Sequence, residues 1–172
     1  MKQKLRIPAI VIATALLLLL AVHLSNRHTF QKLLTVSDGN RIMGGTETVA
    51  VLELTHLDSR TGFVIEDVDK IAEILALVDE LAYFRISFSN NLYTSGQNTY
   101  SILPYAPDGT ELLRDLLVSQ NPRFSYLWPY ETNNRYRMNN TAPLLDYFDE
   151  LFSTQEPLSY AQLNERLDEL FQ

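Results

Sequence analysis

The sequence predicts an α+β fold: an N-terminal transmembrane helix, then a single domain in which an antiparallel sheet is packed by two or three helices. Three observations support this prediction. Apolar residues recur at the two-residue spacing of strands in some segments and at the three- and four-residue spacing of amphipathic helices in others. A Pro-Asp-Gly sequence at residues 107–109 is typical of a hairpin turn. Residues 7–24 form an 18-residue apolar run.

The composition fits one globular domain. The chain has 172 residues, of which 46% are hydrophobic and 20% are charged, so it can build an apolar core. It contains no cysteine, which excludes disulfides, thiolate metal sites and cysteine nucleophiles. Residues 29–172 hold all 21 acidic residues and 10 of the 14 basic ones, a net charge of −11. This part of the chain is therefore expected to bind no nucleic acid.

Residues 1–28 are predicted to be a signal-anchor or transmembrane segment that holds the protein in the membrane through residues 7–24. As a helix, this run is roughly 27 Å long, close to the about 30 Å of a hydrocarbon core. Basic residues before the run outweigh those after it, so the N-terminus is expected inside and the domain outside the cytoplasm: Lys2, Lys4 and Arg6 against Arg27 and Lys32.

The alternative for the N-terminal segment is a cleaved signal peptide, which would leave the domain secreted. Cleavage needs small residues at positions −3 and −1 of the cut. His23 occupies one of these positions in both cuts that we considered, after residue 23 and after residue 25. We therefore expect an uncleaved anchor in the cell membrane.

The tether and the domain are separated by composition. Residues 29–47 contain Gly44-Gly45 and a turn sequence at residues 37–40, which predicts a tether in which only residues 30–34 favour helix. Residues 48–172 are predicted to form the extracytoplasmic α+β domain. This domain is expected to be a monomer that needs no cofactor.

The first half of the domain predicts a strand pair, a helix and another strand. Residues 48–56 alternate as a strand covered on both faces, and a turn leads to a short strand at residues 63–65. Apolar spacing predicts an amphipathic helix over residues 68–82, with Asp67 as its N-cap. Phe84, Ile86 and Phe88 alternate with polar residues, which predicts a half-buried strand.

The second half predicts more strands and two helices. Strands are expected at residues 100–105, 123–130 and 135–138. Residues 111–119 fit either structure, because their leucines suit a helix while the preceding hairpin turn favours a strand; we predict a strand. A helix is expected at residues 144–152. Ser159 to Gln162 fit a capping box that opens a last helix reaching residue 171.

The last helix has a narrow apolar stripe that must be buried. A helix this short is marginal in water unless its apolar face packs on something. We expect the stripe to dock on the domain itself rather than on a partner, because exposed apolar stripes promote aggregation. Its members are Leu163, Leu167, Leu170 and Phe171.

The order of elements resembles a family of small extracytoplasmic domains of unknown function carried by single-pass bacterial membrane proteins. The resemblance covers about residues 48–152. It rests on the strand pair, the helical sequence DVDKIAEILALVDEL, the hairpin around PDG and the closing TAPLLDYFDELF. It implies an α+β domain with an antiparallel sheet, and no activity.

No residue pattern predicts an enzyme or a metal site. The chain contains no nucleophile motif of the GxSxG type, no P-loop and no GxGxxG. His23, His28 and His56 lack the spacing of zinc ligands, and His56 is interpreted as a strand-end residue. The acidic residues at 66–69, 146–150 and 168–169 are better explained by helix capping and solvated helix faces than by calcium binding or glycoside hydrolysis.

Aromatic residues interleaved with Arg and Asn form the candidate binding region. Tyr, Trp and Arg are the residue types that anchor protein interfaces, and aromatic rings also stack on sugars. The alternative is ordinary packing, since aromatic residues are also preferred in strands. The candidate partner-binding residues are Tyr126, Trp128, Tyr130, Arg135, Tyr136 and Arg137.

Two classes of function follow. We favour a non-enzymatic, membrane-anchored module that binds a protein or peptide partner in an accessory or sensing role. The alternative is a module that binds envelope glycans through its strand aromatics. Exposure of Trp128 separates them, because a glycan platform needs an exposed ring.

Overall fold

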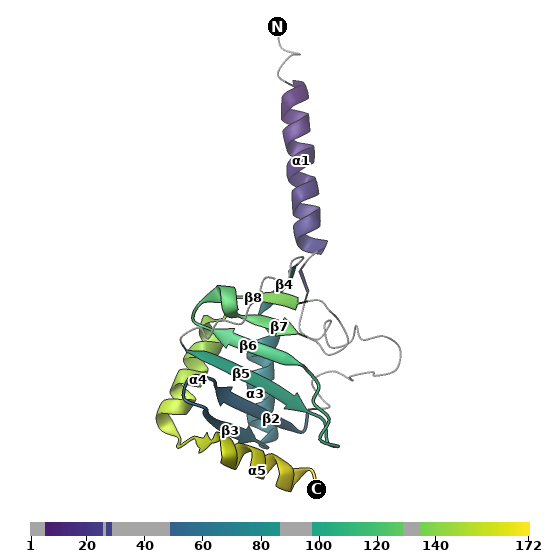
Figure 1. Cartoon of the computed structure of the whole chain (residues 1–172). Coiled ribbons are helices and arrows are strands. Elements are labelled where there is room, and N and C mark those ends of the chain that lie inside the picture. The colour runs from purple at the N-terminus through teal and green to yellow at the C-terminus, as the bar shows by residue number, and fades with distance from the viewer. Residues whose placement is uncertain (1–5, 26, 29–48, 87–97, 129–134) are drawn as a thin grey trace.

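The computed structural model describes residues 6–25, 27–28, 49–86, 98–128 and 135–172, and it confirms the α+β class (Figure 1). Its strands are β1 (Arg27–His28), β2 (Val51–His56), β3 (Thr61–Ile65), β4 (Ala82–Ile86), β5 (Thr99–Tyr105), β6 (Asp115–Ser119), β7 (Tyr126–Trp128), β8 (Arg135–Asn139) and β9 (Leu158–Ser159). They form one sheet of order β1-β4-β8-β7-β6-β5-β2-β3-β9. Every neighbouring pair is antiparallel, as predicted.

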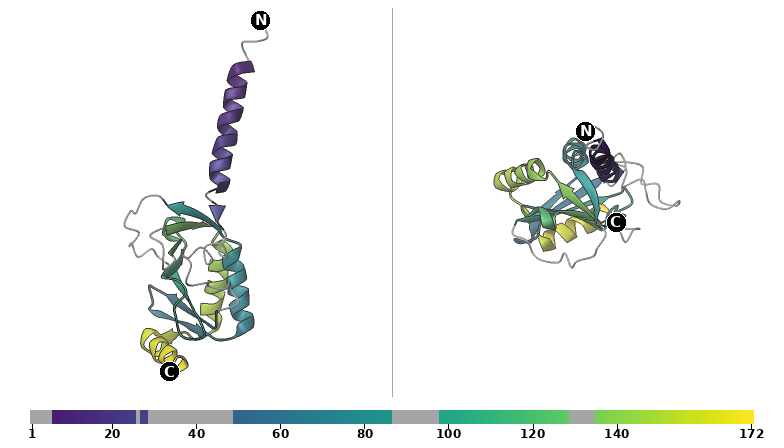
Figure 2. Two further views of the ribbon diagram at one scale, coloured as in Figure 1. Left: turned by 90° about the vertical axis from the view of Figure 1, so that its right-hand side faces the viewer. Right: turned by 90° about the horizontal axis from the view of Figure 1, so that it is seen from above.

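The described residues also form helices. They are α1 (Arg6–Ser25), α3 (Val68–Asp79), α4 (Ala142–Thr154) and α5 (Tyr160–Leu170), with a short 3₁₀ helix, η2 (Pro122–Phe124). The helices α3 and α4 cover one face of the sheet, as the left view of Figure 2 shows. The helix α5 packs on β3, at the end of the sheet farthest from β1. The domain thus has three helices within the described residues, consistent with the predicted two or three.

The main core lies between the sheet and the helices α3 and α4. Successive strand residues point to opposite faces, so register decides which side chains share the core. From β2, Leu52 and Leu54 face these helices, whereas Val51, Glu53 and Thr55 point to the other face. Members of the core that are almost fully buried include Tyr83, Ile102, Leu116, Leu127, Met138 and Phe148.

Two predicted helix starts are confirmed by their hydrogen bonds. The Asp67 carboxylate accepts from the backbone N–H groups of Asp69 (2.9 Å) and Lys70 (3.3 Å), as an N-cap does. At α5, the capping box between Ser159 and Gln162 is present. In the same region β9 pairs with Thr61 and Gly62 of β3, which ties the start of α5 to the sheet.

Two predicted strands are shorter than expected. In residues 111–119 only Asp115–Ser119 is a strand; Glu111 makes a single bridge to Tyr105 instead. In residues 123–130 the first three belong to η2 or follow it, because Pro122 starts a 3₁₀ turn, and the strand is Tyr126–Trp128. Residues 129–130 lie outside the described residues, as do Phe88, the helix-favouring residues 30–34 and the tether turns. The two-residue strands β1 and β9 were not predicted.

The last helix docks on the domain, as predicted, and the four residues of its stripe are buried to different extents. Leu163 is completely buried, whereas Leu167, Leu170 and Phe171 are half-buried. The Phe171 ring lies 5.6 Å from the Tyr105 ring, so the end of α5 reaches β5. A salt bridge of 2.7 Å from Arg166 to Glu66 joins α5 to the segment after β3.

The N-terminal helix α1 extends away from the domain (Figures 1 and 2). Its described side chains, at residues 12–21, are all exposed. Among the described residues, no helix meets the combined requirement of length and apolarity for crossing a membrane.

Candidate functional site

The predicted binding residues divide between the two faces of the sheet. Tyr126, Trp128, Arg135 and Arg137 share the face opposite the helices α3 and α4, because Tyr126 pairs with Arg137 and two-residue alternation places the other two beside them. Tyr136 pairs with Leu127 and points to the helix-covered face, where it is only 5% exposed. Tyr136 is therefore a core residue in this structure. Tyr130 lies outside the described residues.

Trp128 is the centre of the candidate site. The Cζ atom of Arg114 lies 3.8 Å from the centroid of the Trp128 ring, and that of Arg135 lies 4.0 Å from it. Arg114 precedes β6 and Arg135 begins β8, the strands on either side of β7, so a guanidinium group approaches the indole from each side. Such cation–π contacts are worth about 0.5 to 2 kcal/mol each, with the larger value for desolvated pairs.

Sequence reasoning missed Arg114. It lies next to Asp115, which pairs with Trp128, and its backbone N–H donates to the Trp128 carbonyl at 3.1 Å. Only the register between β6 and β7 brings Arg114 to the ring. We use the name arginine corner for Arg114, Trp128, Arg135 and Arg137.

The arginine corner is a surface feature rather than part of the core. Arg114 and Arg137 are exposed, and Trp128 and Arg135 are half-buried. Below them Tyr126 is buried, and its ring lies 5.8 Å from the Arg135 guanidinium carbon. The corner therefore presents charged groups held on a rigid aromatic base.

The charge of the corner is positive among the described residues. Asp115 lies beside the corner, half-buried, and burial raises the pKa of its carboxyl. Attraction to Arg114 and Arg135 lowers this pKa in part, and the nearby charge of Glu111 raises it further. Asp115 is thus a described carboxyl group that interacts with Arg114 and Arg135, and the corner itself contributes three guanidinium groups.

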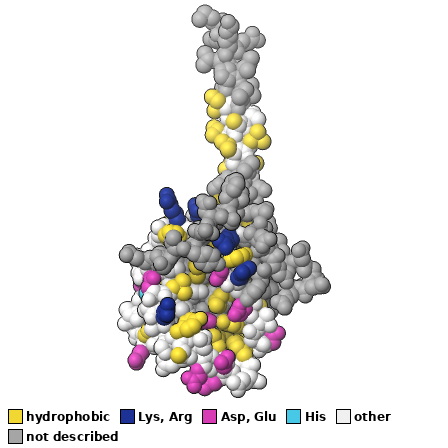
Figure 3. All heavy atoms as spheres, in the orientation of Figure 1, with side chains coloured by type: hydrophobic (Ala, Val, Ile, Leu, Met, Phe, Trp, Pro, Cys, Tyr) yellow, Lys and Arg dark blue, Asp and Glu magenta, His cyan; other side chains and the backbone are white. Residues whose placement is uncertain are grey.

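This positive charge lies at one end of an otherwise acidic domain. In the view of Figure 3, most Lys and Arg side chains gather in the upper part, below α1, and most Asp and Glu side chains gather in the lower part. The elements at the upper end are β4, β8 and β7 (Figure 1). On the face shown, a partner with negative charge is therefore favoured at this end.

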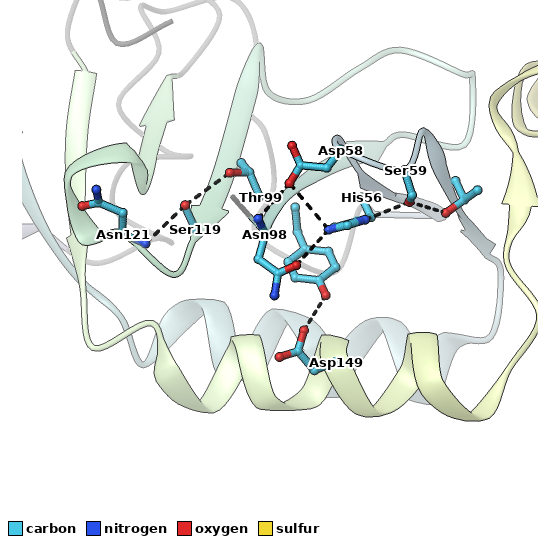
Figure 4. A network of polar contacts seen from close by, with 10 residues as sticks. His56, Asp58, Ser59, Asn98, Thr99, Ser119, Asn121 and Asp149 are labelled. Carbon is cyan, nitrogen blue, oxygen red and sulfur yellow. Dashed lines mark hydrogen bonds and ion pairs between the residues drawn. The ribbon is translucent and has the colours of Figure 1, made fainter. Parts of the chain in front are cut away.

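A second polar cluster surrounds His56 at the end of β2 (Figure 4). The His56 Nδ1 atom lies 2.8 Å from the Ser59 hydroxyl oxygen, and Nε2 lies 3.2 Å from the Asn98 side-chain oxygen. Asp58 is 3.9 Å from Nε2 and accepts instead from the Asn98 backbone N–H at 2.8 Å. The contacts of Asn98 link the end of β2 and the turn after it to the start of β5, and the Ser59 contact closes that turn, so the cluster has a structural role.

The His56 cluster lacks the geometry of a nucleophilic serine. A catalytic triad requires a carboxylate hydrogen-bonded to the imidazole nitrogen that is remote from the serine. Here that nitrogen faces an amide oxygen, and the Asp58 carboxylate is beyond hydrogen-bonding distance. The Ser59 hydroxyl oxygen also lies 2.7 Å from the Thr61 hydroxyl oxygen, which completes the turn.

Two buried polar groups on the strands are paired. Glu53 is 8% exposed, and its carboxylate accepts from the hydroxyls of Thr55 (3.0 Å) and Tyr105 (2.8 Å). On the helix-covered face, the Tyr100 hydroxyl donates to Asp149 at 2.5 Å. Burial, followed by the hydrogen bond and charge of Asp149, raises the pKa of Tyr100, so this hydroxyl stays protonated as a donor. Both contacts stabilise the fold.

A groove of about 430 Å³ lies between α5 and the turn after β5, lined in part by Tyr105, Leu167 and Phe171. It follows from the docking of α5 and contains no cluster of reactive groups. Within the described parts of the chain, no group of three or more His, Asp or Glu residues is placed to hold a metal ion.

Comparison with known proteins leaves the chain without relatives that could assign a function. No protein-family model, no curated protein and no solved structure matches it. The chemistry of the described residues is therefore the basis for proposing a function.

Proposed function

We propose that this chain is a non-enzymatic, membrane-anchored extracytoplasmic module that binds a protein or peptide partner through the arginine corner, in an accessory or sensing role. The observation that carries the proposal is the half-buried Trp128, which lies between two guanidinium groups on an acidic domain. Trp and Arg contribute more than other residues to the binding energy of protein interfaces.

The contacts at Trp128 also lower the cost of binding. Ordering a long side chain at an interface costs about 0.5 to 1.5 kcal/mol. Stacking against the indole already restricts Arg114 and Arg135 in the free protein. A partner that binds them therefore meets a preorganised pair of donors.

The anchor in this proposal is α1. It is supported by the apolar sequence of residues 7–24 and the basic residues before it. The large apolar side chains of Ile12, Leu16 and Leu17 are each at least 60% exposed, so they are available to contact lipid. In this arrangement residues 29–172 lie outside the cytoplasm.

The stacking around Trp128 disfavours the glycan alternative. Sugar rings bind to aromatic residues by stacking on an open ring face. Guanidinium groups take up the close approaches to this ring from both neighbouring strands. Tyr126, the other described aromatic residue of this face of β7, is only 3% exposed.

Site-specific photo-crosslinking tests the proposed partner site. Asn139 is exposed on β8, on the same face as Arg137 and two residues beyond it. We expect a photoreactive residue at position 139 of the full-length chain to form a discrete adduct in native membranes. The same residue at Asp146, exposed on α4, should form none.

Substitution of the corner provides the matching control. Arg135→Gln should reduce the adduct formed from position 139, because it removes one guanidinium group from the corner. Equal adducts from positions 139 and 146, or an adduct that Arg135→Gln leaves unchanged, would show that the partner binds elsewhere.

A further inference from the structure

The arginine corner lies close to the point where the anchor joins the domain. The strand β1, which follows α1, pairs with β4, and β4 pairs with β8. In this register Arg27 lies opposite Phe84, and Phe84 lies opposite Arg137. With neighbouring strands about 4.8 Å apart, Arg137 is roughly 10 Å across the sheet from the end of the anchor segment.

We infer that the segment bound at the arginine corner is an acidic stretch of a second membrane-attached protein, positioned next to the bilayer surface. This inference rests on the proposed function, in which α1 is the anchor. It adds two properties of the partner: the charge of its contact segment and its attachment to the same membrane.

The acidic character follows from local charge. Arg114, Arg135 and Arg137 provide guanidinium groups that bind carboxylates as paired donors. In a protein segment, several Asp and Glu residues close together in sequence can provide such carboxylates. Because charges are screened beyond about 10 Å at 0.1 M salt, a narrow peptide interacts with the corner and little with the rest of the domain.

A peptide fits these charges better than an anionic bilayer does. A bilayer is a broad surface, so it meets the net charge of the domain as well as that of the corner. Residues 29–172 carry 21 acidic and 10 basic residues, and this excess opposes adsorption to anionic lipid. The bilayer is therefore the disfavoured occupant, and the test below includes it.

The position of the arginine corner, near the end of the anchor, indicates that the partner is attached to the same membrane. A site near the end of the anchor can be reached by a segment that leaves the bilayer beside it. Restriction to one membrane raises the effective concentration of the two segments, and such tethering can increase apparent affinity by about 100-fold or more without new contacts. A modest local charge is then sufficient for binding.

The single tryptophan of the chain makes the corner directly measurable. Trp128 is the one tryptophan in the sequence, so its emission reports on the corner alone. The experiment uses the full-length chain in nanodiscs of phosphatidylcholine. The probe is a short peptide rich in Asp and Glu, either free or attached to the disc by an acyl chain, and a peptide with Asn and Gln at the same positions is its neutral match.

We expect the acidic peptide to change the emission of Trp128 in a saturable manner that weakens with salt, and the neutral peptide to leave it unchanged. The attached acidic peptide should act at a total concentration about 100-fold lower than the free one. Arg137→Gln should weaken binding of both by about tenfold. Lys70→Gln, the same loss of charge at an exposed residue of α3, should have no effect.

Each opposing result has a distinct meaning. Equal potency of the free and attached acidic peptides would refute the membrane position and leave the partner site standing. No response to either acidic peptide would refute the acidic segment, while crosslinking from position 139 decides the proposed function separately. A change in Trp128 emission in phosphatidylglycerol discs without peptide, lost in Arg137→Gln, would identify lipid as the occupant and overturn the inference.

Discussion

Gly62→Ala is expected to destabilise the domain by about 3 kcal/mol, because the added methyl group has no space between two strands. Gly62 lies in β3, paired with Thr55 on one side and with Leu158 on the other. A Cβ atom at this position would overlap the Leu54 carbonyl oxygen and lie 3.0 Å from the Thr55 Cα atom. Both are backbone atoms of β2, so a shift of a side chain cannot make space.

Urea unfolding of the full-length protein, followed by circular dichroism, measures this effect. Val64→Ala is the control, because it removes methyl groups from the same face of β3 at a half-buried position without adding any. We expect Val64→Ala to lower the free energy of unfolding by about 1 kcal/mol. If Gly62→Ala unfolds at the urea concentration of the unchanged protein, the pairing of β3 with β2 is wrong.

Leu163→Ala is expected to lower the free energy of unfolding by about 3 kcal/mol, the usual loss when a fully buried leucine is replaced by alanine. Leu163 is the one residue of α5 that is completely buried in the described structure, and α5 is packed mainly on β3. Without this contact the helix is held by half-buried apolar side chains, the two-residue strand β9 and the exposed salt bridge from Arg166 to Glu66. A helix of this length is unstable alone, so α5 should detach.

Hydrogen exchange separates local detachment from global unfolding. In Leu163→Ala the amides of α5 should exchange much faster, while those of α3 keep most of their protection. Leu167→Ala, at a half-buried position of the same helix, should change the exchange rates of the α5 and α3 amides less than Leu163→Ala does. If Leu167→Ala has the larger effect, the docking of α5 is rotated from the arrangement described here.

The helices of this protein were predictable because their signals are local. The apolar spacing of α3, the Asp67 cap and the capping box at Ser159 all lie within a few residues of the helix that they define. The same spacing did not identify Leu163 as the buried member of the stripe. That depends on how α5 lies on β3, which is a contact between segments about 100 residues apart.

The candidate site was predictable only within single strands. Two-residue alternation places Tyr126 with Trp128, and Arg135 with Arg137, on common faces, which is the arrangement in the structure. It could not relate one strand to the next, because a shift of one residue in register exchanges the two faces. For this reason Arg114, which reaches Trp128 through the register of β6 and β7, was missed. Tyr136 was wrongly grouped with Arg135 and Arg137, because alternation within β8 already places it on the opposite face.

Arginine-specific chemical labelling shows whether a partner occupies the arginine corner in the native membrane. Phenylglyoxal modifies accessible guanidinium groups, and mass spectrometry measures the modified fraction at each residue. We predict that Arg137 is modified more slowly in native membranes than in the purified full-length protein, because the partner covers it. Arg60, exposed in the turn before β3, is the internal control and should react equally in both. Equal modification of Arg137 in the two preparations would contradict the proposed function.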